Sequence, residues 1–310
     1  MENNVQNDAQ YDDQIDLREL FGVLWAGSFK ILAITSVFAF VSLIYSLSVP
    51  NQYKSTALLA PAQSDSSGLS GSLGQLSGLT SLAGVSISSG QSSEAQIAQE
   101  IMKSWSFIER FINENDLAVE VYAAEGWSKT SNQLKINDHE YDVENDKWLI
   151  EKESGETGPP SSWSLFKAFS KRLAVSEDTK SGLVSVSIEH YSPQVAKQWL
   201  DMYVEAINAH MQLRQVEKVT NNINYLQAQI EQTSIAEMRE VFYNIIEEQT
   251  KSKMLAEASP EYAFVAVSPS MVAEQKSKPQ RFLICVLGTL IGGIFSILIV
   301  LAMHYFRKLD

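Results

Sequence analysis

The sequence predicts an α+β protein in which two transmembrane helices flank one large domain, itself made of an α/β base and an extended helical hairpin. Three observations predict this class. Residues 31–49 and 282–303 are long uncharged apolar runs near the two ends of the chain. Short strand-like segments alternate with an amphipathic helix between them. After Pro193, a long helical pattern runs to residue 258 without proline or glycine.

The second apolar run, FLICVLGTLIGGIFSILIVLAM, carries no charge. About 20 apolar residues of helix cross a hydrocarbon core about 30 Å thick, and a helix satisfies its own backbone hydrogen bonds in lipid. Lys276, Lys278 and Arg281 precede the run and Arg307 and Lys308 follow it, so cations mark both ends. A buried core helix is the alternative, but so long an uncharged run is unusual in a soluble domain.

The first apolar run follows Lys30 and ends before Pro50. A cleaved signal peptide is the competing interpretation. The preceding thirty residues are long and rich in acids rather than short and basic, and no small-x-small cleavage site follows Val49. We therefore expect an uncleaved anchor. Two spans place both termini on one side of the membrane and leave the intervening chain on the other. Flanking charge by itself leaves the orientation open.

These spans divide the chain into seven parts. In order, we expect an N-terminal tail with a short amphipathic helix at 1–30, a first span at 31–49, an α/β base at 50–192 with a Ser/Gly-rich loop at 63–93, a helical arm at 193–258, a return strand and proline-marked linker at 259–281, a second span at 282–303 and a tail at 304–310. The helix in the first tail runs from Ile15 to Trp25. It suits a membrane interface or is simply the end of the first span.

Within the base, residues 53–60, 118–121, 148–150, 173–175 and 183–188 are predicted strands. Residues 93–113 are predicted to form one amphipathic helix, whose buried face holds Ile97, Ile101, Trp105, Ile108 and Ile112. The Ser/Gly-rich loop carries leucines at three- and four-residue steps. It is either a flexible loop or a segment that orders only when protomers assemble.

The arm is predicted to begin at Ser192 and Pro193, a capping residue followed by proline at the first helical position. A continuous helix over 193–258 would be roughly 100 Å long, whereas the 23 residues left to reach Arg281 span at most about 80 Å. We therefore expect a hairpin that bends near residues 233–234 and descends to about 258. Residues 261–267 should form a strand in the same sheet as 53–60.

Two patterns suggest helix packing or assembly. Gly288 and Gly292 form a G-x-x-x-G in the second span, and Gly293 and Ser296 extend its small surface. This surface fits contact with the other span or with another protomer. The arm carries a heptad-like seam whose partner is either the returning arm or a neighbouring protomer; its members are Val216, Val219, Ile223, Leu226 and Ile230.

Composition and motifs exclude several functions. A net charge of −13 argues against nucleic-acid binding. The only cysteine, Cys285, lies in the second span, so no disulfide forms within the chain. Its four histidines are scattered without ligand spacing, and neither a phosphate-binding loop nor a serine nucleophile motif occurs. We expect no catalytic residues, no metal and no cofactor.

Six sequence words together resemble the Wzz-type chain-length determinants, the polysaccharide co-polymerases. They are IDLREL at 15–20, YKSTA at 53–57, SGLVSVSIEHYSP at 181–193, MREVFYNIIEEQTK at 238–251, EYAFV at 261–265 and KPQRFLI at 278–284. The last word resembles the family's proline-marked entry to its second span, which points to Pro279 and Arg281. The chain departs from the family in having less proline between the last strand and this entry, and in a shorter arm than the longer members.

The resemblance implies a bacterial inner-membrane protein with both termini cytoplasmic and the large domain periplasmic, its base near the membrane. It implies a ring-shaped homo-oligomer that is not an enzyme. Such a ring sets the modal length of lipopolysaccharide O-antigen made by a Wzy-type polymerase, and therefore acts on lipid-linked polysaccharide. We hypothesise that the spans contact the polymerase.

Rival functions come from other classes. A membrane adaptor of a capsule or exopolysaccharide system would need a separate cytoplasmic tyrosine kinase, and residues 307–310 offer that kinase little surface. A two-span sensor would need a cytoplasmic output module, for which neither tail has room. A periplasmic glycan transferase would need a catalytic site.

Overall fold

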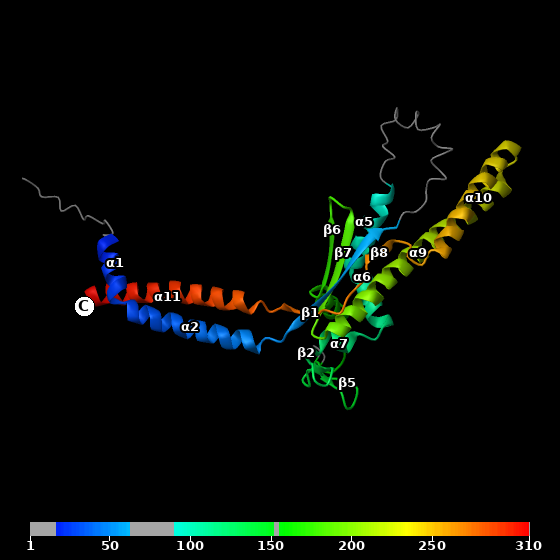
Figure 1. Cartoon of the computed structure of the whole chain (residues 1–310). Helices are drawn as coiled ribbons and strands as arrows, with labels where there is room; N and C mark the ends of the chain where they lie inside the picture. The colour runs from blue at the N-terminus through cyan, green and yellow to red at the C-terminus, as the bar shows by residue number, and fades with distance from the viewer. Residues whose placement is uncertain (1–16, 63–89, 152–154, 310) are drawn as a thin grey trace, which may run out of the picture. The chain divides into compact units, whose positions relative to one another are not determined.

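The computed structural model describes residues 17–62, 90–151 and 155–309 and divides the chain into two units (Figure 1). The helical unit comprises Met1–Val49 and Lys278–Asp310, and the central unit is Pro50–Ser277. Within the helical unit the described helices are α1 (Leu17–Ala26), α2 (Ser28–Ser48) and α11 (Arg281–Leu309). Of the expected N-terminal amphipathic helix, Ile15 lies outside the described residues, as does most of the Ser/Gly-rich loop.

The central unit is organised around strand β1 (Gln52–Pro61), which pairs antiparallel with β7 (Leu183–His190) and β8 (Phe264–Ser268). Strand β6 (Leu173–Asp178) extends the sheet beyond β7, and the short β9 (Lys276–Lys278) also pairs with β1. Every second residue of β1 is buried over Ser55, Ala57 and Leu59, because successive side chains of a strand point to opposite faces. The expected pairing of the return strand with the first strand is confirmed.

Helices α5 (Gly90–Lys103), α6 (Trp105–Glu114), α8 (Ser162–Ser170) and the first half of α9 (Pro193–Gln232) form one core with the buried face of the sheet. The buried aromatic rings pack edge-on or tilted; Tyr203 lies 4.8 Å from Phe111, 5.3 Å from Phe107 and 5.4 Å from Phe169, measured between ring centroids. Aromatic pairs of this kind add to the burial of apolar area. The core therefore anchors one end of α9 to the sheet.

Helix α9 continues past the sheet and packs against α10 (Ala236–Ala258) (Figure 1). Ser192 caps α9 by accepting a hydrogen bond from Val195 N at 3.4 Å, as the Ser-Pro start predicts. At the other end, α9 stops at Gln232, and the bend lies at the predicted position near Thr233. Gln212 Nε2 donates to Ala256 O at 2.9 Å, so the start of the arm on α9 meets the end of α10. The two helices form an antiparallel hairpin.

Residues between the first helices and β6 form two small hairpins. One pairs β2 (Ala124–Ser128) with β3 (Gln133–Ile136), and the other pairs β4 (Tyr141–Asp142) with β5 (Lys147–Trp148). The strands expected at 173–175 and 183–188 are confirmed, whereas of the strand expected at 148–150 only Trp148 lies in a strand, β5. Strands β2, β3, β4 and β9 and helix α8 were not predicted.

Two predictions in this region are wrong. Residues 118–121 form a helix, α7 (Ala118–Tyr122), rather than a strand. Val121 N donates to Leu117 O at 2.9 Å and Ala123 N to Val119 O at 2.8 Å, the spacing of an α-helical turn. A four-residue apolar run fits either structure, and here the helix places Val121 in the core.

The helix expected over 93–113 is broken at Ser104. Its hydroxyl donates to Ile101 O at 2.7 Å and accepts from Phe107 N at 3.4 Å, so it ends α5 and caps α6. The break rotates the two halves, and Ile97 and Trp105 are exposed instead of buried. Trp105 Nε1 donates to Ser162 Oγ at 2.8 Å at the surface. Ile108 and Ile112 are buried as expected.

Candidate functional site: the helix pair and the return segment

The glycines of the G-x-x-x-G motif lie against α2 of the same chain. A Cβ atom at Gly288 would be 1.7 Å from Ser42 Oγ, and one at Gly292 would be 2.5 Å from Phe38 Cβ. Both are far inside van der Waals contact, so only glycine allows this approach of the two backbones. Of the two packing partners left open by the sequence, the structure places the other span of the same protomer here.

Ser296 continues the contact one turn further along α11. It is buried, its hydroxyl lies 3.3 Å from Thr35 Oγ1, and it donates to Gly293 O at 2.7 Å. Gly293, by contrast, has no atom within 4 Å of where its Cβ would be. The four small residues therefore divide into three that face α2 and one that faces away from it.

Most other side chains of α2 and α11 are exposed. Only 6% of the most apolar stretch of α2 is buried, and 17% of that of α11. A core helix of a soluble protein is largely covered. Both helices are long and apolar enough to cross a membrane by length and composition, and they present that apolar surface outward.

The two residues that the resemblance named at the entry to the second span, Pro279 and Arg281, lie at the start of α11. Arg281 is its first residue, and Pro279 precedes the helix by two positions. Arg281 N donates to Pro279 O at 3.0 Å. The proline therefore ends the linker and does not occupy the first helical position.

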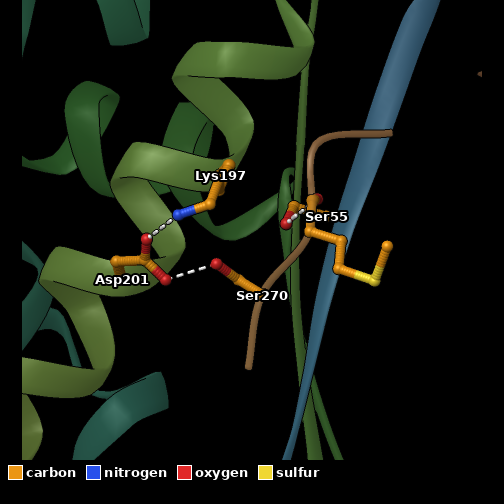
Figure 2. Close-up of polar contacts among 5 residues, drawn as sticks. Ser55, Lys197, Asp201 and Ser270 are labelled. Carbon is orange, nitrogen blue, oxygen red and sulfur yellow. Dashed lines mark hydrogen bonds and ion pairs between the residues drawn. The ribbon is translucent and has the colours of Figure 1, made fainter. Parts of the chain in front are cut away.

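The segment between β8 and β9 is attached to the rest of the central unit by serine hydroxyls (Figure 2). Buried Ser270 donates to Asp201 Oδ1 on α9, and Lys197 Nζ lies 2.5 Å from the other oxygen of this carboxylate. On the other side, buried Ser55 of β1 donates to Met271 O at 2.9 Å. The ion pair is exposed and contributes about 1 kcal/mol or less, so the buried hydroxyls carry more of this attachment. The segment is fixed to both α9 and β1.

Asn208 on α9 fixes the start of β8. Its Oδ1 accepts from Ala263 N at 2.9 Å and from Phe264 N at 2.8 Å, and its Nδ2 donates to Phe264 O at 2.9 Å. The amide is buried. It therefore satisfies backbone groups that would otherwise be buried without partners.

The arm seam faces the returning helix. Val219 is buried and Val216, Ile223, Leu226 and Ile230 are partly buried, along the stretch of α9 that packs with α10. Val219 is thus covered within one protomer by the returning arm, which is one of the two partners that the sequence left open. Exposed apolar residues of the arm lie on both helices, and three of them, Met238, Val241 and Ile245, recur at helical spacing on α10.

His190 and Arg172 are two basic groups of the central unit whose pKa values are lowered. Burial, and then the nearby Arg172 guanidinium, lower the pKa of His190 to about 3. Burial also lowers the pKa of Arg172, whose guanidinium donates to Val121 O at 3.3 Å and lies 5.1 Å from the centre of the Tyr191 ring. These contacts join α7, β7 and the start of α9, which is a structural role.

No group of three or more histidine, cysteine, aspartate or glutamate side chains in the described parts of the chain is arranged to hold a metal ion. Asp201 accepts a hydrogen bond from Ser270 with one carboxylate oxygen and is paired with Lys197 through the other. Nδ1 of His210 lies 3.1 Å from a guanidinium nitrogen of Arg110, so this histidine has a cation as its neighbour.

Sequence reasoning missed Asn208, Asp201 and the two serines that hold the return segment. One signal was available for Asn208. The buried face of α9 runs at helical spacing through Tyr203, Ile207 and Met211, and Asn208 is an amide within that stripe. A polar residue on an apolar face indicates a specific buried partner. Ser55 and Ser270 carry no such signal, because serine is ordinary in strands and linkers.

One protein-family model matches part of this chain. The family model described as "Wzz: Chain length determinant protein" matches residues 13–115. No curated protein matches the chain. Among solved structures, it is similar to a "full-length bacterial polysaccharide co-polymerase" at 13% identity and a TM-score of 0.38, over 96% of this chain and 99% of that one. It is also similar to a fragment of WzzB, a polysaccharide co-polymerase from Salmonella Typhimurium, at 14% identity and a TM-score of 0.28, over 74% and 100% of the two chains.

At these identities and TM-scores, neither structure assigns a residue role or an assembly to this chain. The family match is stronger because it covers a continuous segment that includes α2, β1, α5 and α6. It also includes two of the words on which the sequence resemblance rests, at 15–20 and 53–57. The resemblance is confirmed, and this chain is similar to the Wzz chain length determinants, the polysaccharide co-polymerases.

Proposed function

We propose that this protein is a non-enzymatic regulator in the bacterial inner membrane that sets the modal chain length of lipopolysaccharide O-antigen made by a Wzy-type polymerase. It acts as a ring-shaped homo-oligomer. The observation that carries the proposal is the family match over residues 13–115, which begins before the first apolar helix and continues into the core of the central unit.

The two apolar helices support membrane insertion. From Phe282 to Tyr305, two exposed aromatic residues near the ends of α11, the helix rises about 35 Å, which is comparable with a hydrocarbon core of about 30 Å and its borders. The central unit also begins and ends at one place, because Ser277 Oγ donates to Gln52 O at 3.2 Å. Such a unit suits a periplasmic loop between two adjacent spans, with both termini cytoplasmic.

The arm and the sheet edges support a ring. A closed ring needs two unlike surfaces on each protomer that fit each other. Exposed Met238, Val241 and Ile245 give α10 an apolar stripe, and the edge strand β8 exposes Val265 and Val267. We propose that these surfaces, rather than the seam between α9 and α10, contact neighbouring protomers.

The outward surface of the helix pair is proposed to contact the polymerase and its lipid-linked polysaccharide. Gly288, Gly292 and Ser296 face α2, so they act on a partner only by holding α2 and α11 together. Gly293 faces away from α2 and leaves a small notch. Pro279 and Arg281 lie where the linker enters α11.

The test is a gel profile of surface lipopolysaccharide from cells with and without the gene, and with the gene restored. Deletion should change a clustered band distribution into a steadily decaying ladder, and restoration should return the cluster. Unchanged O-antigen with loss of capsule or exopolysaccharide would instead support the adaptor function. No change in any surface glycan would contradict both.

A further inference from the structure

Four exposed aromatic side chains gather at one end of the helix pair. Their exposed fractions are 77% for Trp25, 82% for Phe29, 66% for Tyr305 and 68% for Phe306. Gly27, between the first two, packs on Val300 of α11. This contact brings the start of α2 level with the last turns of α11, so the four rings surround the same end of the pair.

The chain bends at this end. Gly27 N donates to Val23 O at 2.9 Å and Ile31 N donates to Gly27 O at 3.0 Å, and the helix is interrupted between these bonds. A Cβ at Gly27 would lie 2.5 Å from Val300 Cγ1, so glycine allows the bend to rest directly on α11. In Figure 1, α1 crosses the end of the pair instead of extending it.

Large exposed rings in this position need an environment that is partly apolar and partly polar. Tryptophan and tyrosine have an apolar body and a polar edge, and they concentrate where lipid meets water. The four rings come from three helices and continue the exposed apolar surface of α2 and α11. A lipid interface covers such a surface on every side, whereas a single protein partner would cover one side.

We propose that α1 is an interfacial helix, which lies along the membrane surface on the side of the chain termini with Trp25 and Phe29 at the level of the headgroups. Tyr305 and Phe306 complete a ring of aromatic side chains at the same depth. The partner is a lipid bilayer. This inference rests on the proposed insertion of α2 and α11 in a membrane.

The test uses the full chain in vesicles of phosphatidylcholine and phosphatidylglycerol, with bromine near the carbonyl end or near the methyl end of the phosphatidylcholine chains. The fluorescence difference between wild type and Trp25→Phe isolates Trp25 from the five other tryptophans, which all lie in the central unit. We expect stronger quenching by the shallow bromines and little by iodide in the water. Quenching by iodide without quenching by bromine would overturn the proposal.

A second variant separates this proposal from membrane insertion itself. Leu290 is exposed near the middle of α11, so Leu290→Trp in the Trp25→Phe background should be quenched most by the deep bromines. If Leu290→Trp responds but Trp25 does not, α1 is not interfacial although the spans are inserted. If neither responds, insertion and the interfacial helix both fail.

The bend provides a matched pair of variants. Gly27→Ala would place a methyl group against Val300, whereas Gly22→Ala in α1 meets no atom within 4 Å. We expect Gly27→Ala to change the ratio of shallow to deep quenching of Trp25 and Gly22→Ala to leave it unchanged. Equal ratios in both variants would show that the contact of Gly27 with Val300 does not set the depth of α1.

Discussion

His190 is a neutral histidine whose two ring nitrogens both contact the backbone. Nδ1 accepts from Ser192 N at 3.2 Å, which leaves the proton on Nε2, directed at Glu120 O at 3.5 Å. Trp199 covers the ring at 4.7 Å between centroids. A proton added to this ring would break the contact with Ser192 and place a second cation near Arg172. The folded state therefore resists protonation.

This resistance makes the stability of the central unit depend on pH. The pKa of His190 falls from 6.5 to about 3 on folding, so between these values the unfolded chain binds the extra proton and stability decreases as pH falls. The loss between pH 7 and pH 5 is about 2 kcal/mol from this group. His190→Gln should remove that part of the pH dependence in urea unfolding followed by fluorescence.

Exposed His139 supplies the control. His139→Gln makes the same chemical change at an exposed position and is compared with His190→Gln in the same unfolding measurement. If His190→Gln behaves like His139→Gln, the pKa of His190 does not fall on folding, and the description of its site is wrong.

At the scale of the elements, the paired helices α2 and α11 make the sharpest distinction between neighbouring residues. Gly288→Leu would place a side chain against Ser42, and Gly292→Leu would place one against Phe38. The side chain of Gly293→Leu would point into open space. The same change at adjacent positions should therefore separate the helices in one case and not in the other.

A disulfide reports this separation. Thr35 and Ser296 have hydroxyl oxygens 3.3 Å apart, so Thr35→Cys with Ser296→Cys, in a Cys285→Ala background, should oxidise readily in membranes. Gly292→Leu should reduce the yield several-fold and Gly293→Leu should leave it high. A high yield in both would show that the small residues do not control the packing of the pair.

The elements also show where sequence patterns are informative. Long apolar runs and the Ser-Pro helix start predicted α2, α11 and α9 close to their observed positions, because each pattern allows one structure. The four residues from Ala118 and the break at Ser104 were misread because helix and strand, or one helix and two, fit the pattern equally well. At the first site the helix places Val121 in the core, and at the second the break lets Ser104 cap α6.

The packing site was partly visible in the sequence. Gly288 and Gly292 marked a close contact, but the spacing alone does not tell whether the partner is α2 or another protomer. The hydroxyls of Ser55 and Ser270 gave no signal, because their partners are more than 60 residues away in the chain. Contacts of that kind depend on how the sheet and α9 come together.

At the scale of the whole molecule, the proposed ring depends on contacts made by the arm. Val219 of the α9 seam is buried, whereas the apolar stripe at Met238, Val241 and Ile245 is exposed, and we propose that this stripe meets a neighbouring protomer. An aspartate in a dry contact costs several kcal/mol, while on the surface of a monomer it costs little.

Val241→Asp should therefore reduce the oligomer to smaller species without unfolding the protein. Asn244 is exposed on the same helix, and Asn244→Asp adds the same charge outside the stripe as a control. The mass of each variant in lipid nanodiscs or detergent measures the outcome. Retention of the wild-type mass by Val241→Asp would remove α10 from the proposed contact.

The hydrogen bond from Ser277 to Gln52 closes the central unit at its two ends. Whatever lies between these residues, the chain leaves the unit close to where it entered. A central unit with a longer arm, or one taken from a relative, could therefore be joined to α2 and α11 without moving their connected ends apart. Residues 50–277 could therefore be exchanged as one piece, and on the proposed function chimeras joined at Val49 and Lys278 should take their length preference from the donor of that piece.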